Sequence, residues 1–183
     1  MKELLFVTGN PLKVEQIAKY LRFPVGHIKI ELDEIQAADL ATVATDKALR
    51  AYALVGKPVL VEDTGLFFSA LNGLPGPFIK WFLGEAGNDR LTSMLDGFTD
   101  RSALAETCFA LCDETGVHIF SGERRGSIAN IPRGTTRFGW NPIFIPEGES
   151  QTWAEMEEAG LQFNSMRQLA LEKLQVYLDE HYR

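Results

Sequence analysis

The chain has 183 residues, of which 45% are hydrophobic and 23% are charged, a composition that suits one globular domain (residues 1–183) with a substantial core. The formal net charge of −7, without a basic stripe, argues against a nucleic-acid polymer as partner. No apolar run is long enough to span a membrane, and the N-terminus turns polar too early for a secretory signal, so we expect a soluble cytoplasmic enzyme or binding protein.

The N-terminal segment predicts a strand, a tight polar turn and a helix. The apolar run 4–7 is followed by the turn sequence TGNPLK at residues 8–13. Apolar residues then recur at the i, i+3, i+4, i+7 spacing of a helix with one buried face: Val14, Ile17, Ala18 and Leu21. Such a turn presents backbone N–H groups to an anion, and Lys13 adds a charge. It lacks the second glycine and the Lys-Ser/Thr pair of a Walker A loop, so a plain connection is the alternative.

The next segments predict an alternation of strands and helices. Residues 27–32 have the composition of a strand, and residues 40–54 that of a helix carrying Lys47. A short apolar strand, residues 59–61, follows. Strands that alternate with helices indicate an α/β fold.

The strand at 59–61 is followed at once by two carboxylates, Glu62 and Asp63, and by a turn. Ligands of open α/β sheets bind beyond the carboxyl ends of strands, so Asp63 stands where a metal ligand or a general base is expected. Neighbouring strand residues point to opposite faces, so Glu62 and Asp63 cannot both face one site unless the chain has already turned. The alternative is a solvated acidic turn or a helix cap.

A loop rich in glycine and proline, residues 73–77, leads into the amphipathic segment 78–83. This loop could position Lys80 against an anion. The apolar face of residues 81–83 fits either the core or a contact between subunits.

The second half of the chain predicts a helix, an antiparallel portion of the sheet and a closing helix. Residues 88–97 suggest the first helix, and residues 103–112 and 117–125, with a segment near Ile128, suggest the strands. The sheet is therefore expected to be mixed. The last helix is expected at residues 165–181.

The two cysteines, Cys108 and Cys112, lie on one expected strand, roughly 13 Å apart and too far for a disulfide. Buried thiols in a reducing compartment are expected. In the loop that follows the strands, a flat ligand could stack on Phe138 or Trp140. The alternative is an aromatic side chain that fixes the loop to the core.

The motifs TGNPLK, LDEIQ, VEDTGL, ALNGLPGPFIKWFL, PRG, FGWNPIF, TWAEM and a closing SMR occur in the order and spacing of the inosine triphosphate pyrophosphatase family, which this chain resembles over its whole length. Members hydrolyse non-canonical purine nucleoside triphosphates such as ITP, XTP and dITP to monophosphate and pyrophosphate. The resemblance implies an elongated α/β fold, with a central cleft between two lobes of a mixed sheet. It also implies a homodimer that uses Mg²⁺.

The resemblance further implies roles for individual residues. Glu34 and Asp63 would serve the metal, and Asp63 would also activate water. Lys47 and Lys80 would neutralise the polyphosphate. The full substrate-binding set would be Thr8, Gly9, Asn10, Lys13, Lys47, Thr64, Lys80, Phe138, Gly139, Trp140, Asn141 and Arg167. Attack on a phosphoryl group needs charge neutralisation and a positioned water, which agrees with this set.

The departures from the family pattern lie near the C-terminus. Asn141 replaces an aspartate, Leu161 and Gln162 replace a Lys-Asn pair, and Met166 replaces a histidine. A site that hydrogen-bonds one base edge discriminates strongly between bases, so we expect altered base preference before loss of hydrolysis. Restoring Asn141→Asp, Leu161→Lys and Met166→His together is expected to raise ITP activity.

The leading hypothesis is a nucleoside triphosphate pyrophosphatase. The alternatives are a catalytically weak nucleotide-binding homologue and a hydrolase of a different nucleotide phosphoanhydride.

Overall fold

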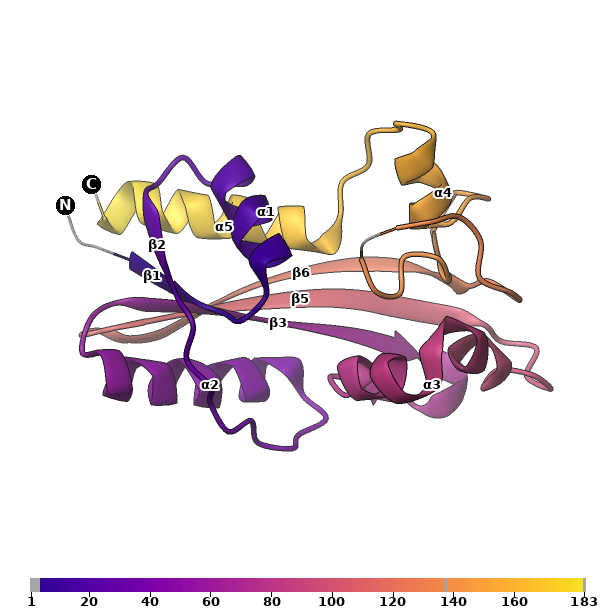
Figure 1. Cartoon of the computed structure of the whole chain (residues 1–183), viewed down its shortest axis with the longest axis horizontal. Coiled ribbons are helices and arrows are strands. Elements are labelled where there is room, and N and C mark those ends of the chain that lie inside the picture. Colours follow the sequence, from indigo (N-terminus) through magenta and orange to yellow (C-terminus); the bar gives the residue numbers. More distant parts are fainter. Residues whose placement is uncertain (1–3, 137, 183) are drawn as a thin grey trace. The chain divides into compact units, whose positions relative to one another are not determined.

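The structure is a computed structural model that describes residues 4–136 and 138–182 (Figure 1). Its contacts divide the chain into two compact units. Unit 1 contains Met1–Asp63, Thr107–Gly122 and Met166–Arg183, and unit 2 contains Thr64–Glu106 and Glu123–Ser165. The prediction of a single domain stays a prediction, as do the elongated shape and the cleft between lobes.

A seven-stranded mixed sheet is the framework of the described chain, in the order β2-β1-β3-β5-β6-β7 with β4 paired to β3. The strands are β1 Leu4–Val7, β2 Val25–Ile28, β3 Val59–Phe68, β4 Pro75–Gly76, β5 Ser102–Asp113, β6 Gly116–Ile128 and β7 Phe144–Pro146. β1 runs parallel to β2 and β3, whereas the β3–β4 and β6–β7 pairs are antiparallel. The predicted mixed sheet flanked by helices is confirmed.

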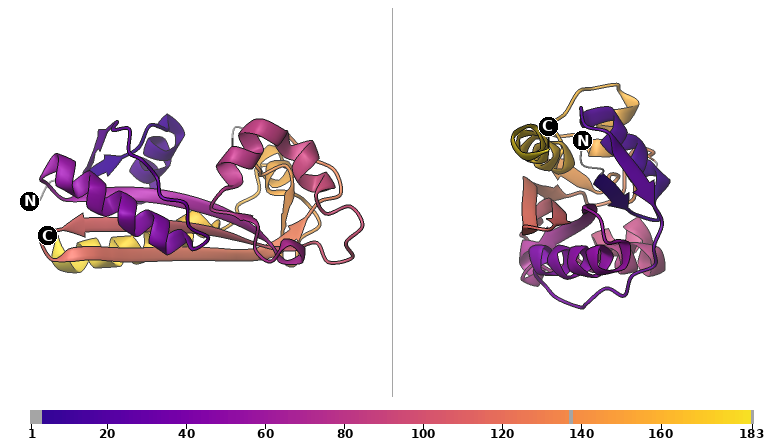
Figure 2. Two further views of the ribbon diagram at one scale, coloured as in Figure 1. Left: turned by 90° about the horizontal axis from the view of Figure 1, so that it is seen from below. Right: turned by 90° about the vertical axis from the view of Figure 1, so that its left-hand side faces the viewer.

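In unit 1, helices cover both faces of the sheet (Figures 1 and 2). α1 (Pro11–Tyr20) and α5 (Met166–His181) lie on one face, and α2 (Leu40–Val55) lies on the other. Side chains of α1 and α5 share one core cluster with strands β1, β3, β5 and β6: Leu4, Phe6, Ile17, Leu60, Phe109, Leu111, Phe120, Ala170, Leu171, Leu174 and Leu178 belong to it.

α2 forms close to where its sequence predicts a helix, at Leu40–Val55 rather than 40–54. The Asp39 side chain caps its N-terminus by accepting from the backbone N–H of Thr42, and Gly56 ends it in a left-handed conformation. Four small or branched residues let the helix pack closely on the sheet: Val43, Ala44, Ala48 and Ala51 are buried. This packing brings Lys47 to the sheet.

β3 differs from the sequence prediction. The expected strand stops at Val61 and turns, but β3 continues through the two carboxylates to Phe68. An acidic residue fits inside the strand because cations compensate Glu62, as described below. Beyond the acids the strand is held by antiparallel pairing of Leu66 and Phe67 with β4.

Unit 2 contains the 3₁₀-helix η1 (Ser69–Leu71), α3 (Ile79–Ser93) and α4 (Trp153–Glu158) with the remaining strand segments. The predicted helix at 88–97 ends earlier, at Ser93. It is also joined to the 79–86 segment across a kink, because Gly87 adopts φ 75° and ψ 174°.

The strand predicted at 27–32 lies instead at Val25–Ile28.

Both cysteines, Cys108 and Cys112, are buried free thiols on β5, as predicted. Within residues 4–136 and 138–182, no helix has the length and apolar character that crossing a membrane requires.

Candidate functional site

The turn between β1 and α1 is shaped by its own side chains. Asn10 caps α1, with its Oδ1 accepting from the backbone N–H of Leu12 at 3.0 Å, and Pro11 starts the helix. The Thr8 hydroxyl accepts from the backbone N–H of Asn10 at 3.1 Å, and Gly9 lies exposed between them. This is the tight strand-turn-helix that the sequence predicts, and it places Lys13 in the first turns of α1.

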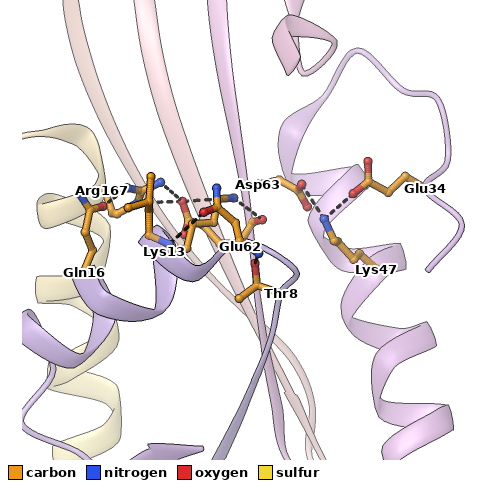
Figure 3. Close-up of polar contacts among 10 residues, drawn as sticks. Thr8, Lys13, Gln16, Glu34, Lys47, Glu62, Asp63 and Arg167 are labelled. Carbon is orange, nitrogen blue, oxygen red and sulfur yellow. Dashed lines mark hydrogen bonds and ion pairs between the residues drawn. The ribbon is translucent and has the colours of Figure 1, made fainter. Parts of the chain in front are cut away.

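On the α1 and α5 side of β3, the Glu62 side chain is fully buried among cations (Figure 3). Arg167 at the start of α5 donates from Nε and Nη2 to Glu62 Oε1, at 2.8 and 2.6 Å. Lys13 Nζ lies 3.6 Å from the same oxygen and donates to the Glu62 backbone carbonyl at 3.3 Å. Arg167 Nη1 also donates to Gln16 Oε1. One strand carboxylate thus joins α1, β3 and α5.

Asp63 points to the opposite side of β3, toward α2 (Figure 3). Lys47 Nζ on α2 bridges Asp63 Oδ1 at 3.0 Å and Glu34 Oε1 at 2.5 Å. β3 stays extended through both acids, and neighbouring residues of a strand point to opposite faces. Glu62 and Asp63 therefore lie on different faces, as predicted for a strand that has not turned. The strand therefore carries two polar clusters back to back.

Burial and charge act against each other at these groups. Burial raises the pKa of Asp63, while the charges of Lys47 and Lys13 pull it down without cancelling the rise. Burial lowers the pKa of Lys13, although Glu62 opposes the change. Burial also acts to lower the pKa of Lys47, but Asp63 and Glu34 outweigh it, and the pKa of Lys47 is raised. Asp63 is therefore a better proton acceptor than an exposed aspartate.

The predicted metal ligands, Glu34 and Asp63, are brought together by Lys47. Asp63 Oδ2 is buried and makes no hydrogen bond to any residue that the structure describes. Groups of three or more His, Cys, Asp or Glu side chains that could enclose an ion do not occur in the described part of the chain. Two carboxylates fit a magnesium-type ion that takes its other oxygen ligands from water and phosphate.

In unit 2, the loop that contains Phe138 and Gly139 is attached to α3. Asn88 Nδ2 donates to the Gly139 carbonyl at 3.0 Å. The Trp140 ring is 7% exposed and packs 5.7 Å from Trp153 and 5.8 Å from Phe144, measured between ring centroids. Of the two stacking candidates, Trp140 fixes the loop to the core, and Phe138 is partly buried. Stacking of a flat ligand on Phe138 stays a prediction.

The other predicted residues of unit 2 have different surroundings. Thr64 follows Asp63 in β3 and is partly buried. Lys80 is exposed, with its ammonium 5.6 Å from the centroid of the Trp81 ring. The Asn141 carboxamide donates to Glu157 Oε1 at 2.7 Å. The participation of Lys80 in phosphate binding stays a prediction.

The remaining departures have different surroundings as well. Leu161 is 47% exposed and Gln162 is also exposed. Met166 is 7% exposed and begins α5, with its backbone carbonyl against Gly122 of β6. Met166 therefore acts as a packing residue of unit 1 in this structure.

Sequence reasoning gave Glu62 no role and did not single out Gln16 or Asn88. A signal for Glu62 was present, because an acid inside an apolar strand requires a buried cation. Gln16 lies one helical turn after Lys13, on the same face of α1, which is a weaker signal. No pattern marks Asn88.

Comparison with known proteins gives one consistent result. A sequence model described as the Ham1 family matches residues 4–177. The chain is 42% identical to the inosine triphosphate pyrophosphatase of Tuber melanosporum, over 97% of each chain. It is 44% identical to the protein of the same name from Yarrowia lipolytica, over 97% of this chain and 96% of the relative. A solved structure of a HAM1 protein from Coxiella burnetii superposes with a TM-score of 0.84 at 30% identity, covering 98% of this chain and all of the other.

Proposed function

Because the chain belongs to the Ham1 family, we propose that it is a nucleoside triphosphate pyrophosphatase acting on non-canonical purine nucleotides. Its substrates are inosine triphosphate and related compounds such as XTP and dITP, and its products are the nucleoside monophosphate and pyrophosphate. The two relatives at 42% and 44% identity are named inosine triphosphate pyrophosphatases, and the likeness covers nearly their full length.

The observation that carries the proposal is the pair of polar clusters on β3. Asp63 with Lys47 and Glu34 lies on one side of the strand, and Glu62 with Lys13 and Arg167 lies on the other. A polyphosphate carries several negative charges, and its hydrolysis depends on neutralising them and positioning a water. Lysines next to a buried carboxylate of raised pKa supply both requirements.

Asp63 is the general base of the proposed reaction. Its buried Oδ2, which makes no hydrogen bond within residues 4–136 and 138–182, accepts a proton from water as the water oxygen attacks phosphorus. The bond between that phosphorus, which stays on the nucleoside, and the oxygen that bridges to the next phosphate breaks. Pyrophosphate leaves with the electron pair of this bond. Lys47 holds Asp63 through Oδ1, so the orientation of the carboxylate is fixed before substrate binds. Lys13 contributes positive charge for the phosphates.

Glu34 and Asp63 would hold a divalent cation, which we propose is Mg²⁺. The ion would supply additional neutralisation of the phosphate oxygens. Lys47 occupies the position between the same two carboxylates. It would therefore share them with the ion and would remain available to the phosphates.

We assign base binding to the loop of unit 2. Phe138 offers a partly buried ring for stacking, and Asn141 offers a carboxamide for the base edge.

The same proposal includes a homodimer and a cytoplasmic location. Exposure of Trp81, at 63%, supports a subunit contact, and two buried free thiols suit a reducing compartment. Sedimentation of the purified protein tests the dimer.

The experiment that tests the function is pyrophosphate release from a panel of triphosphates with Mg²⁺. The panel contains ITP, XTP, dITP and the canonical nucleotides. We expect release from the first three at a higher kcat/KM than from ATP. Binding of ITP without release of pyrophosphate would instead indicate a weak nucleotide-binding homologue. Turnover only of a different phosphoanhydride would replace the proposed substrate.

A further inference from the structure

The Asn141 side chain is held by an acid on α4. Its Nδ2 donates to Glu157 Oε1 at 2.7 Å, and the other oxygen of Glu157 accepts from the Thr136 hydroxyl at 2.6 Å. All three residues lie in unit 2 and are partly buried. Thr136 thus holds one carboxylate oxygen of Glu157, and the other oxygen holds the side chain of Asn141.

This contact decides which end of the carboxamide faces outward. An ionised carboxylate only accepts hydrogen bonds, so the Asn141 NH₂ group must face Glu157 and Oδ1 must face away. An asparagine that is free to turn presents a donor or an acceptor with similar ease. Held by Glu157, Asn141 presents the acceptor that an aspartate would present, without the charge.

The backbone around Asn141 is held by hydrogen bonds, so the orientation of the side-chain amide is the main feature of this residue that can change. The Asn141 N–H donates to the Phe138 carbonyl at 3.0 Å, and the Asn141 carbonyl accepts from Ala154 at the start of α4 at 3.3 Å. Asn88 holds the neighbouring Gly139 carbonyl. Because the loop is fixed on both sides, a change at Glu157 acts on the direction of the Asn141 amide.

We propose that Glu157 is a positioning residue for base selection, which holds Asn141 Oδ1 toward the bound base and so favours purines with a ring N–H at that edge. The inference rests on the proposed function. Hypoxanthine and xanthine carry that N–H, whereas adenine has a lone pair at the same ring nitrogen. An acceptor that faces a lone pair makes no hydrogen bond, and the site discriminates against the base.

The same contact bears on the expectation that Asn141→Asp, made together with Leu161→Lys and Met166→His, raises ITP activity. An aspartate at 141 would bring a second carboxylate to a position where Nδ2 is now 2.7 Å from Glu157. Two carboxylates at that distance repel each other or share one proton, and the pKa of one rises strongly. Asn141→Asp therefore has to be combined with Glu157→Gln. The glutamine at 157 would then donate the hydrogen bond and the aspartate at 141 would accept it, the reverse of the present pair.

The test compares ITP and ATP as substrates of matched variants. Glu157→Ala is expected to lower the ratio of kcat/KM for ITP to that for ATP by about tenfold, the effect of one hydrogen bond. Asn141→Asp is expected to lose ITP activity near pH 7 and to add an ionisation to its pH profile. Asn141→Asp with Glu157→Gln is expected to regain the ratio of the unmodified protein and to lose that ionisation.

Glu158→Gln is the matched control. Glu158 is the next acid of α4, and its Oε1 accepts from the hydroxyl and the backbone N–H of Thr135, whereas the Asn141 amide donates to Glu157. Its ratio of ITP to ATP is expected to stay unchanged. If Glu157→Ala fails to fold, Glu157→Gln serves instead, because it keeps the shape of the side chain and lets the amide face either way. The ratio is then expected to fall in the same direction by a smaller factor.

The outcomes separate this inference from the proposed function. An unchanged ITP to ATP ratio in folded Glu157→Ala, or no rescue by the double variant, overturns the role of Glu157 while pyrophosphate release continues. Absence of pyrophosphate release from every triphosphate with the unmodified protein removes the proposed function and this inference together.

Discussion

At the scale of the residue, the central feature is a pair of neighbouring acids with different surroundings. Asp63 could be predicted as a candidate because a carboxylate after an apolar strand is easily recognised. The partner of Glu62 could not be predicted, because Arg167 is 105 residues away in the sequence. Sequence periodicity assigns a face to a side chain, but it does not say what is packed against that face.

Replacing Glu62 by Gln is expected to destabilise the fold. The side chain of Glu62 is fully buried, and its loss leaves the side chains of Arg167 and Lys13, 14% and 21% exposed, without their counter-charge. Removing one partner of a buried ion pair costs about 3–5 kcal/mol. Urea denaturation of Glu62→Gln measures the loss. A free energy of unfolding within about 1 kcal/mol of the unmodified value would exclude the structural role of this cluster.

A second buried acid makes stability depend on pH. Asp113 accepts from the Tyr182 hydroxyl at 2.6 Å and from the Thr115 backbone N–H and hydroxyl. Burial acts to raise the pKa of Asp113, but these hydrogen bonds outweigh it, and the pKa is lowered. The stabilisation is therefore present above the ordinary aspartate pKa and is lost as the pH falls through the lowered one.

Tyr182→Phe tests this assignment. It is expected to lower the free energy of unfolding by about 1.5–3 kcal/mol at pH 7, the value of a hydrogen bond to a charged group. The difference is expected to shrink as the solution is acidified and Asp113 is protonated. Tyr20→Phe, at a tyrosine that is 41% exposed, is the control and should change little. A Tyr182→Phe effect that is constant down to acid pH contradicts the assignment.

At the scale of the element, the sequence predicts helices with regular periodicity better than strands that change character. α2 and α5 were predicted to within a residue at each end, because the apolar spacing of each helix is regular along its length. The length of β3 was missed, because the acids suggested an end where buried cations allow the strand to continue. The kink of α3 depends on the positive φ of Gly87, which the sequence does not specify.

The contact of β6 with α5 requires Gly122. A Cβ atom built there would lie 2.0 Å from the Met166 carbonyl oxygen and 2.7 Å from the Ala170 nitrogen, both backbone atoms. Gly122→Ala is therefore expected to destabilise the fold by about 1–3 kcal/mol or more. Gly84→Ala on α3 is the control, since a Cβ there meets nothing within 4 Å and alanine favours a helix. Equal melting temperatures for the two variants would contradict the close packing.

At the scale of the whole molecule, the family could be identified from the order of its motifs, and the fold and the comparisons confirm it. The contacts at the proposed base-binding end could not be predicted in the same way. The sequence shows Asn141 only as a departure from the family pattern, whereas the structure shows that its side chain donates to Glu157, 16 residues later. Such a contact depends on where α4 meets the loop, and no local pattern encodes it.

Removal of divalent ions is expected to stop turnover and leave the fold intact. Glu34 and Asp63 are already bridged by Lys47, so the apo protein has its own counter-charge at the proposed metal site. EDTA should abolish pyrophosphate release from ITP, and excess Mg²⁺ should restore it. The melting temperature should stay within about 2 °C throughout, because two carboxylates bind the ion weakly without phosphate. Unfolding by EDTA would indicate a structural metal instead.

The most direct test of the account is the kcat for pyrophosphate release from ITP by Asp63→Asn, measured beside Asp46→Asn. Asp46 lies next to Lys47 on α2 but pairs with Arg50, so its variant controls for the loss of a charge nearby. We predict that Asp63→Asn keeps its circular dichroism spectrum and loses kcat by about 10³-fold, the contribution of a general base, while Asp46→Asn keeps its activity. A folded Asp63→Asn variant with a kcat within about tenfold of the unmodified protein would contradict the assignment of Asp63 as the catalytic base.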